Sequence, residues 1–391
     1  MTNKKIQIGL AALCTVSAAH AQSAVTLYGV VDSPVEYVNH LAGGAPTIDP
    51  ATGAITQRPG GNRLSLVNSG GASGSRWGLR GVEELGGGLN AVFVLESGFG
   101  ADNGISSQGG RLFGRQAFVG LESKGIGRLT FGRQYTSIFE AFSNFTPLAY
   151  APLYEPSSLL LGANNRSDNT VKYLGAFGPV TAAAHFTFGA GTGSLGSTTL
   201  AGGGAGESAG HFRDNSGYGA SVTYLGGAFG ATIGYDQWNP AVTTGNAGNA
   251  RKAGTAISYK YGPAKFVAGY RWGDTKDSAD VTLVRDDFYW VGVNYKATSA
   301  VTLDLAYYYD NAKTFRVSRT AAATNPANPW QVSFRAIYSL SKRTDLYMTT
   351  AYAKHSGLNL DTSANGFASG YFLSPGNDNQ FGAALGIRHR F

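Results

Sequence analysis

Residues 265–272 read Lys-Phe-Val-Ala-Gly-Tyr-Arg-Trp, a stretch in which two kinds of side chain alternate. The even positions hold Phe, Ala, Tyr and Trp, whereas the odd positions hold Lys, Val, Gly and Arg. Alternation with a period of two is typical of a β-strand whose two faces meet different surroundings. Both cations fall on one face. We therefore expect this face to meet water and the aromatic face to meet an apolar phase.

The same alternation recurs along the chain, at residues 229–236, 255–261, 289–295, 301–310, 332–340 and 381–391. A soluble β-sandwich would also alternate. Here, however, the apolar faces end in aromatic rings, as expected where strands cross a membrane interface: Tyr235, Trp272, Tyr295 and Tyr309. The opposite faces carry Gly, Thr, Asp, Lys and Arg rather than a second apolar core. The pattern favours a transmembrane β-barrel around a wet lumen.

Short and long connections alternate between these strands. Short turns are predicted near residues 83–88, 123–127, 175–179, 226–227, 261–263, 296–300 and 341–344. Longer Gly-, Asn-, Ser- and Asp-rich segments such as 189–216 and 311–329 lie between them. This is the plan of an outer-membrane barrel with tight periplasmic turns and long outer loops. Seven turns, with terminal strands at Val25 and Phe381, predict a 16-stranded antiparallel barrel.

The cost of burying charge in lipid sets the register of the strands. An Arg or Lys facing lipid at midplane costs about 2–4 kcal/mol in such barrels. Lys265 and Arg271 therefore require the odd face of their strand to line the lumen. A slip of one residue would expose both cations to lipid.

Composition and the first residues agree with export to a membrane. The chain has 391 residues, 56 of them glycine, only 14% charged residues and a net charge of +7. Lys4 and Lys5, an apolar stretch at 6–18 and Ala-His-Ala at 19–21 predict a cleaved signal peptide at residues 1–21. The domain at 22–391 would then keep a net charge of +5 and no cysteine, because Cys14 leaves with the peptide. This charge is too dilute for a nucleic-acid partner, and no later apolar run reaches the length of a membrane helix.

Six motifs stand out along the chain: Ser-Ala-Val-Thr-Leu-Tyr-Gly-Val-Val-Asp at 23–32, Ser-Arg-Trp-Gly-Leu-Arg-Gly at 75–81, Leu-Gly-Gly-Gly-Leu-Asn-Ala-Val-Phe at 85–93, Phe-Gly-Arg-Gln-Ala-Phe-Val-Gly-Leu at 113–121, Leu-Thr-Phe-Gly-Arg-Gln at 129–134 and Gly-Ile-Arg-His-Arg-Phe at 386–391. Together they resemble the trimeric general porins of Gram-negative bacteria, in their β-proteobacterial branch. The resemblance covers essentially all of residues 22–391. It implies a water-filled outer-membrane channel for passive diffusion of small hydrophilic solutes and ions.

The resemblance also implies an inward-folded third loop, at residues 135–165, which narrows the pore opposite a ladder of basic side chains. The ladder corresponds to Arg76, Arg80, Arg115, Arg166 and Lys172, and the loop carries Glu140, Glu155, Tyr150 and Tyr154. More cations than carboxylates predict a modest preference for anions. Arg115 shares parity with Ala117 and Val119 rather than with a polar row, so it is placed in the ladder on resemblance alone.

Three further expectations concern partners. Arg133 lies on the outward face with Leu129 and Phe131. It is either a subunit contact near Asp102 of the second loop or a rim residue facing lipid headgroups. Phe391 ends an alternating last strand, and the resemblance implies that it is the signal read by the barrel-assembly machinery. A homotrimer in contact with outer-membrane lipid or lipopolysaccharide is implied in the same way.

Other readings of the sequence are a substrate-specific porin, in which loop aromatics form a binding track, and a non-conducting adhesin or structural barrel. Gly-Glu-Ser-Ala-Gly at 206–210 matches the G-x-S-x-G pattern of hydrolases, but it lacks the preceding apolar strand that such an elbow requires. An outer-membrane phospholipase would need a Ser and His pair on an outward face, and none is found. We expect no enzyme activity, no cofactor and no metal site.

Overall fold

The computed structural model describes residues 24–49, 54–160, 164–191, 206–362 and 369–391, so the predicted signal peptide at 1–21 lies outside the described residues. The elements in chain order are β1 (Ala24–Ala42), β2 (Thr47–Ile48), β3 (Ile55–Thr56), β4 (Gly60–Leu66), β5 (Arg76–Gly86), β6 (Leu89–Gly98), α1 (Ser107–Gly110), β7 (Gln116–Ser123), β8 (Gly127–Tyr135), α2 (Ser137–Phe142), η1 (Ser143–Phe145), α3 (Ser157–Leu160), β9 (Arg166–Phe177), β10 (Val180–Thr187), β11 (Gly217–Gly226), β12 (Phe229–Trp238), β13 (Asn249–Tyr261), β14 (Ala264–Lys276), β15 (Thr282–Lys296), β16 (Val301–Phe315), β17 (Trp330–Ser339), β18 (Thr344–Lys354), η2 (Leu358–Leu360) and β19 (Asn379–Arg390). None of the described helices is both long and apolar enough to cross a membrane.

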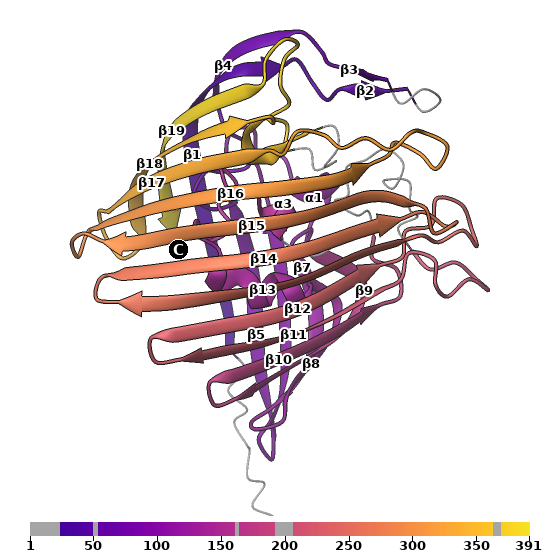
Figure 1. Cartoon of the computed structure of the whole chain (residues 1–391). Coiled ribbons are helices and arrows are strands. Elements are labelled where there is room, and N and C mark those ends of the chain that lie inside the picture. The colour runs from indigo at the N-terminus through magenta and orange to yellow at the C-terminus, as the bar shows by residue number, and fades with distance from the viewer. Residues whose placement is uncertain (1–23, 50–53, 161–163, 192–205, 363–368) are drawn as a thin grey trace, which may run out of the picture.

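The strands form one closed antiparallel wall (Figure 1). Within the described residues the main sheet has 17 strands. From β5 to β19 each strand pairs with the next one along the chain, and β1 pairs with β19 to close the ring. β5 pairs with the first half of β1, and β4 pairs with the second half. The two segments are therefore parts of one wall strand. Counted in this way the wall has 16 strands, which confirms the predicted architecture.

The connections alternate as predicted. The seven short turns lie together at one end of the barrel, which faces left and downward in Figure 1, and the long loops lie at the other end. The turn between β5 and β6 shows the local chemistry. Gly86, Gly87 and Gly88 adopt φ angles of 89°, 61° and 79°, which residues with a Cβ rarely adopt.

The two faces of the wall separate apolar from polar side chains. On β14 the outward Phe266 is 49% exposed, whereas the side chain of Arg271 is fully enclosed in the lumen and binds Asp286 through two hydrogen bonds of 2.7 and 2.8 Å. On β16, Leu305 and Tyr307 point outward, while Asp304 is buried inside. The predicted register is confirmed on these strands.

The last residue closes the ring against a glycine of the first strand. Phe391 and Gly29 exchange two backbone hydrogen bonds of 3.1 Å. A Cβ added at Gly29 would lie 2.3 Å from the Phe391 ring and 2.8 Å from the carbonyl oxygen of Arg76. Gly29 therefore leaves the space into which the terminal ring packs.

Candidate functional site

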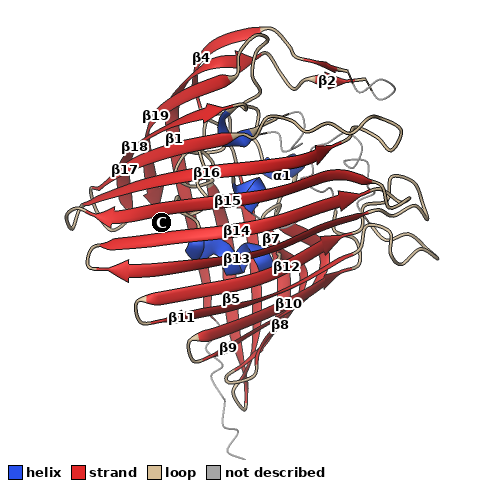
Figure 2. Cartoon of the chain, in the orientation of Figure 1, coloured by secondary structure: helices blue, strands red, loops and turns tan. Residues whose placement is uncertain are grey.

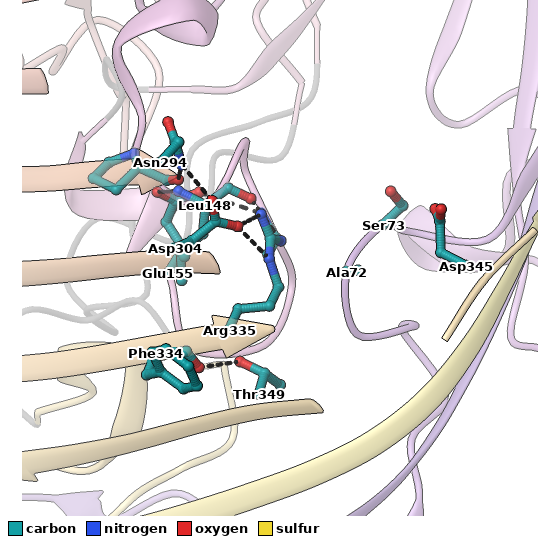
Figure 3. A network of polar contacts seen from close by, with 12 residues as sticks. Ala72, Ser73, Leu148, Glu155, Asn294, Asp304, Phe334, Arg335, Asp345 and Thr349 are labelled. Carbon is teal, nitrogen blue, oxygen red and sulfur yellow. Dashed lines mark hydrogen bonds and ion pairs between the residues drawn. The ribbon is translucent and has the colours of Figure 1, made fainter. Parts of the chain in front are cut away.

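The described part of the third loop, residues 136–160 and 164–165, crosses the lumen and packs against the inner wall. Phe145 accepts a hydrogen bond of 2.8 Å from Trp290 Nε1 on β15, and Leu148 accepts one of 3.0 Å from Arg335 on β17 (Figure 3). Tyr154 accepts a further bond of 2.8 Å from Gln331 on β17. Figure 2 shows the helices of this loop enclosed by the strands.

The loop follows this path because one of its sides is apolar. Ile138, Phe142, Phe145 and Leu148 are fully buried, and they form a cluster with inward aromatic residues of the wall such as Trp290. Removing this area from water stabilises the packed loop by roughly 25 cal/mol for each Å². The lumen is therefore filled on this side.

Polar contacts fix the start of the loop to β9, β10 and β11. Lys172 Nζ lies 2.6 Å from Glu140 Oε2, and it also donates to the Tyr135 carbonyl oxygen at 2.8 Å. The Ser137 N–H donates to His185 Nδ1 at 3.2 Å, and Ser221 donates to the Ser137 carbonyl oxygen at 3.1 Å. These bonds hold α2 on the wall.

Lys172 differs in position from the predicted ladder. Its side chain is only 3% exposed and lies beneath the loop, where Glu140 compensates its charge. Parity placed Lys172 correctly on the lumen face. Parity could not show that the loop covers this part of the face, because that contact joins residues far apart in the sequence.

Three of the predicted cations line one cavity, which we call the passage. Arg76 at the start of β5, Arg115 just before β7 and Arg166 at the start of β9 line a cavity of about 400 Å³. Tyr135, Phe139 and Tyr150 line the same cavity as a stack, with neighbouring ring centroids 4.4 and 4.5 Å apart. Tyr135 accepts hydrogen bonds from Arg115 at 2.7 Å and from Arg166 at 3.4 Å, so its hydroxyl orients two of the guanidinium groups.

Arg115 has the same parity as Ala117 and Val119, yet its side chain points into the lumen because the strand is locally irregular here. Gln116 is the register partner of Glu96, yet the backbone N–H of Arg115 also donates to the Glu96 carbonyl oxygen at 3.1 Å. Arg115 precedes the regular part of β7, and its side chain turns inward to place Nε 2.6 Å from Glu96 Oε1. The inward position implied by the resemblance is therefore the observed one.

Glu96 is a functional candidate that the sequence analysis did not single out. Besides Arg115, it lies 3.7 Å from Arg76 Nε and accepts a hydrogen bond of 3.0 Å from the Tyr28 hydroxyl. The signal was present, because Glu96 alternates with the outward Phe93 and Leu95. It is a carboxylate inside the basic row, and it reduces the local charge while orienting two arginines.

Arg80 lies apart from these three cations. It is exposed, and its guanidinium lies 5.6 Å from the centre of the Tyr28 ring. Arg80 is two residues further along β5 than Gly78, which is the register partner of Glu96, and so lies closer to the short turn. The structure therefore places Arg80 in the lumen, toward the end of the barrel that carries the short turns.

The acidic and aromatic residues predicted on the loop divide into two groups. Tyr150 lines the passage and donates to the Phe139 carbonyl oxygen at 2.8 Å. Tyr154 and Glu155 are buried behind the loop, where Tyr154 donates to Glu36 at 2.9 Å. Burial raises the pKa of Glu155. Neither Tyr154 nor Glu155 presents its side chain to the passage, and both hold the loop in place.

Arg133 and Asp102 make separate contacts within the chain. Arg133 lies 2.6 Å from Asp168, which also binds Arg111 at 2.9 Å. Asp102 accepts a hydrogen bond of 2.9 Å from Asn68. A role of either residue between subunits stays a prediction.

The described residues form neither the nucleophile elbow of a hydrolase nor a cluster of metal ligands. Residues 206–210 lie in the loop between β10 and β11, where the described part contains neither the strand nor the helix of a nucleophile elbow. In the part of the chain that the structure describes, no three His, Cys, Asp or Glu side chains group as metal ligands would.

A family model described as Gram-negative porin matches residues 9–358. An outer membrane porin protein of Bordetella pertussis is 30% identical over 407 residues, which cover 96% of each chain. Outer membrane porin protein 32 of Delftia acidovorans is 30% identical over 99% of this chain and 100% of that protein. The solved structure of an anion-selective porin from Comamonas acidovorans is similar with a TM-score of 0.70 and 26% identity, over 95% of this chain and 100% of that one.

Proposed function

This chain belongs to the Gram-negative porin family, and we propose that the passage between its third loop and its basic wall conducts small hydrophilic solutes, anions more readily than cations. It is a protein of the bacterial outer membrane, and its barrel forms a channel for passive diffusion. Selection occurs at the narrow passage by size and by charge.

The charge of the passage carries this proposal. Arg76, Arg115 and Arg166 line it, and Glu96 is the carboxylate paired with two of them, so these four groups carry a net charge of +2. At physiological salt the Debye length is about 8 Å, and partly buried charges are screened less than exposed ones. An anion therefore enters at lower electrostatic energy than a cation. The solved relative from Comamonas acidovorans is itself described as anion-selective.

A planar-bilayer recording in a KCl gradient tests the proposal. We expect single-channel steps and a reversal potential of the sign given by chloride, with a magnitude that falls as total salt rises. Absence of steps would support the alternative of a non-conducting barrel. Steps whose reversal potential has the sign expected for potassium would contradict a preference for anions.

The stacked rings in the passage favour one second candidate, a substrate-specific porin. Tyr135, Phe139 and Tyr150 stack on one another beside three arginines, and the Arg166 guanidinium lies 4.8 Å from the centre of the Tyr135 ring. Such a surface would bind anions that carry a flat apolar part. Conductance that saturates with one such solute, and not with chloride, would identify this candidate.

A homotrimer is supported by an asymmetry in the outward side chains. From β11 to β18 the outward face carries aromatic anchors of the kind found at lipid interfaces: Tyr218, Tyr235, Trp272, Tyr289, Tyr309, Trp330 and Tyr352. On β1, β7, β8 and β19 the exposed outward residues are mainly aliphatic, with Tyr37, Phe131 and Phe381 as exceptions: Val25, Leu27, Val119, Leu121, Leu129, Leu385 and Ile387. The aliphatic side fits a partner subunit, and the aromatic side fits lipid or lipopolysaccharide.

Replacing Val119 by Asn is expected to reduce the trimeric fraction on native gels. An amide left without a partner at a packed interface costs about 1–3 kcal/mol. The matched control is Ile257→Asn on β13, which is equally outward and aliphatic but lies on the aromatic side. Equal trimer loss in both variants would contradict the assignment of the two sides.

Deleting Phe391 is expected to lower the amount of assembled barrel in the outer membrane several-fold. The ring packs over Gly29, and its backbone closes the barrel, so two roles must be separated. We propose recognition by the barrel-assembly machinery as the first role. Normal refolding of the truncated chain in detergent, together with failure in cells, supports recognition. Failure in both settings would assign Phe391 to closure alone.

A further inference from the structure

The tip of the third loop adopts an unfavourable backbone conformation beside the passage. Ala149, Tyr150 and Tyr154 have φ angles of 58°, 58° and 66°. Side chains with a Cβ disfavour this left-handed region, and such residues persist only where the surroundings hold them. Tyr150 and Pro152 of the same segment line the passage. The width of the passage therefore depends on whatever holds the tip.

Glu155 holds the tip from within the loop. Its carboxylate accepts hydrogen bonds of 2.9 Å from the Leu148 N–H and 3.2 Å from the Ala151 N–H, and it receives the Tyr308 hydroxyl of β16 at 2.9 Å. These bonds enclose Ala149 and Tyr150, two of the three strained residues. They attach the tip to β16 and not to β1.

Glu36 on β1 makes that second attachment. It is fully buried, and its Oε1 accepts a hydrogen bond of 2.9 Å from the Tyr154 hydroxyl. Its Oε2 receives Arg63 of β4 at 3.0 Å, which compensates the buried charge. The same Oε1 accepts a second bond of 2.7 Å, from the Tyr371 hydroxyl.

Tyr371 belongs to the eighth loop, between β18 and β19, and this loop also enters the lumen. Residues Leu358–Leu360 are buried, and Asn359 donates to the Pro152 carbonyl oxygen at 3.1 Å. The backbone N–H of Asn359 donates to Gln331 on β17, the residue that also binds the Tyr154 carbonyl oxygen. The eighth loop therefore supports the tip of the third loop from behind.

We propose that Glu36 is a positioning residue of the channel, which couples the eighth loop to the third loop and keeps the strained tip in the passage. The inference rests on the proposed channel function. Two loops reach one carboxylate oxygen through tyrosine hydroxyls, so displacement of the eighth loop weakens the attachment of the third. The eighth loop is thereby a second element that sets the width and steadiness of the passage.

Single-channel recording of three variants tests this role. Tyr154→Phe removes the bond of the third loop, Tyr371→Phe removes that of the eighth, and Glu36→Gln weakens both. A hydrogen bond to a charged group contributes enough that its loss is expected to raise the frequency of brief conductance changes about tenfold. We also expect higher mean conductance and a reversal potential closer to zero in a KCl gradient.

A double variant and a control separate positioning from general stability. Tyr154→Phe is expected to add less fluctuation to Glu36→Gln than it adds to the wild type, because Glu36→Gln has already weakened the contact that Tyr154→Phe removes. Tyr295→Phe removes an outward, exposed hydroxyl and is expected to match the wild type. Wild-type fluctuations in Tyr154→Phe and Tyr371→Phe alike would overturn the inference. Absence of conductance in the wild-type protein would instead overturn the proposed function.

Discussion

Replacing Arg76 and Arg115 together by alanine is expected to abolish the preference for anions. In the wild type, three arginines and Glu96 give the passage a net charge of +2. In the double variant Arg166 and Glu96 remain, and their charges cancel. Glu96 also loses both arginines that contact it, so no cation paired directly with it remains. We expect a reversal potential near zero or of the opposite sign, and higher conductance because two large side chains are gone.

The measurement is the reversal potential in a KCl gradient, compared with two reference variants. Glu96→Gln is expected to act in the opposite direction, since it removes the negative charge of the passage and strengthens anion preference. Arg343→Ala removes an exposed arginine from the short turn between β17 and β18 and is expected to leave selectivity unchanged. If the double variant kept the wild-type reversal potential, the basic wall would not be the selective element.

The strands and their register could be predicted from the sequence because both follow from local patterns. Alternation over a few residues determines which side chains share a face. The cost of placing Lys265 or Arg271 in lipid then determines which face is inward. The seven turns were found for a similar reason, since their Gly-rich sequences are local signals. The split of the second wall strand into β4 and β5 was not foreseen.

The site was harder to predict because it depends on what lies over each inward side chain. Arg76 and Lys172 have the same inward parity, yet one lines the passage and the other lies under the loop. Glu155 and Tyr154 were expected at the constriction, whereas they bind the wall through residues more than a hundred positions away. Such pairings join elements brought together by the fold, and no spacing within the sequence encodes them.

Replacing Arg335 by methionine is expected to destabilise the barrel by about 3–5 kcal/mol, the usual cost of removing one partner of a buried ion pair. Arg335 on β17 donates twice to Asp304 Oδ2, at 2.9 and 2.7 Å, and both side chains are buried (Figure 3). It also donates to the Leu148 carbonyl oxygen at 3.0 Å. The variant would leave a buried carboxylate and a loop carbonyl without this donor.

Urea unfolding of the refolded barrel in lipid vesicles, followed by tryptophan fluorescence, measures the loss. Adding Asp304→Asn to Arg335→Met is expected to recover much of the stability, because the amide carries no charge and its oxygen can still accept from Asn294. Lys354→Met is the matched control: it breaks an ion pair of the same 2.7 Å length, but Lys354 and Asp378 are exposed to solvent, so little change is expected. Equal losses in Arg335→Met and Lys354→Met would show that burial does not determine the contribution of the Asp304 pair. If Asp304→Asn failed to reduce the loss of stability, that loss would come from the contact with Leu148 and the third loop rather than from the unpaired carboxylate.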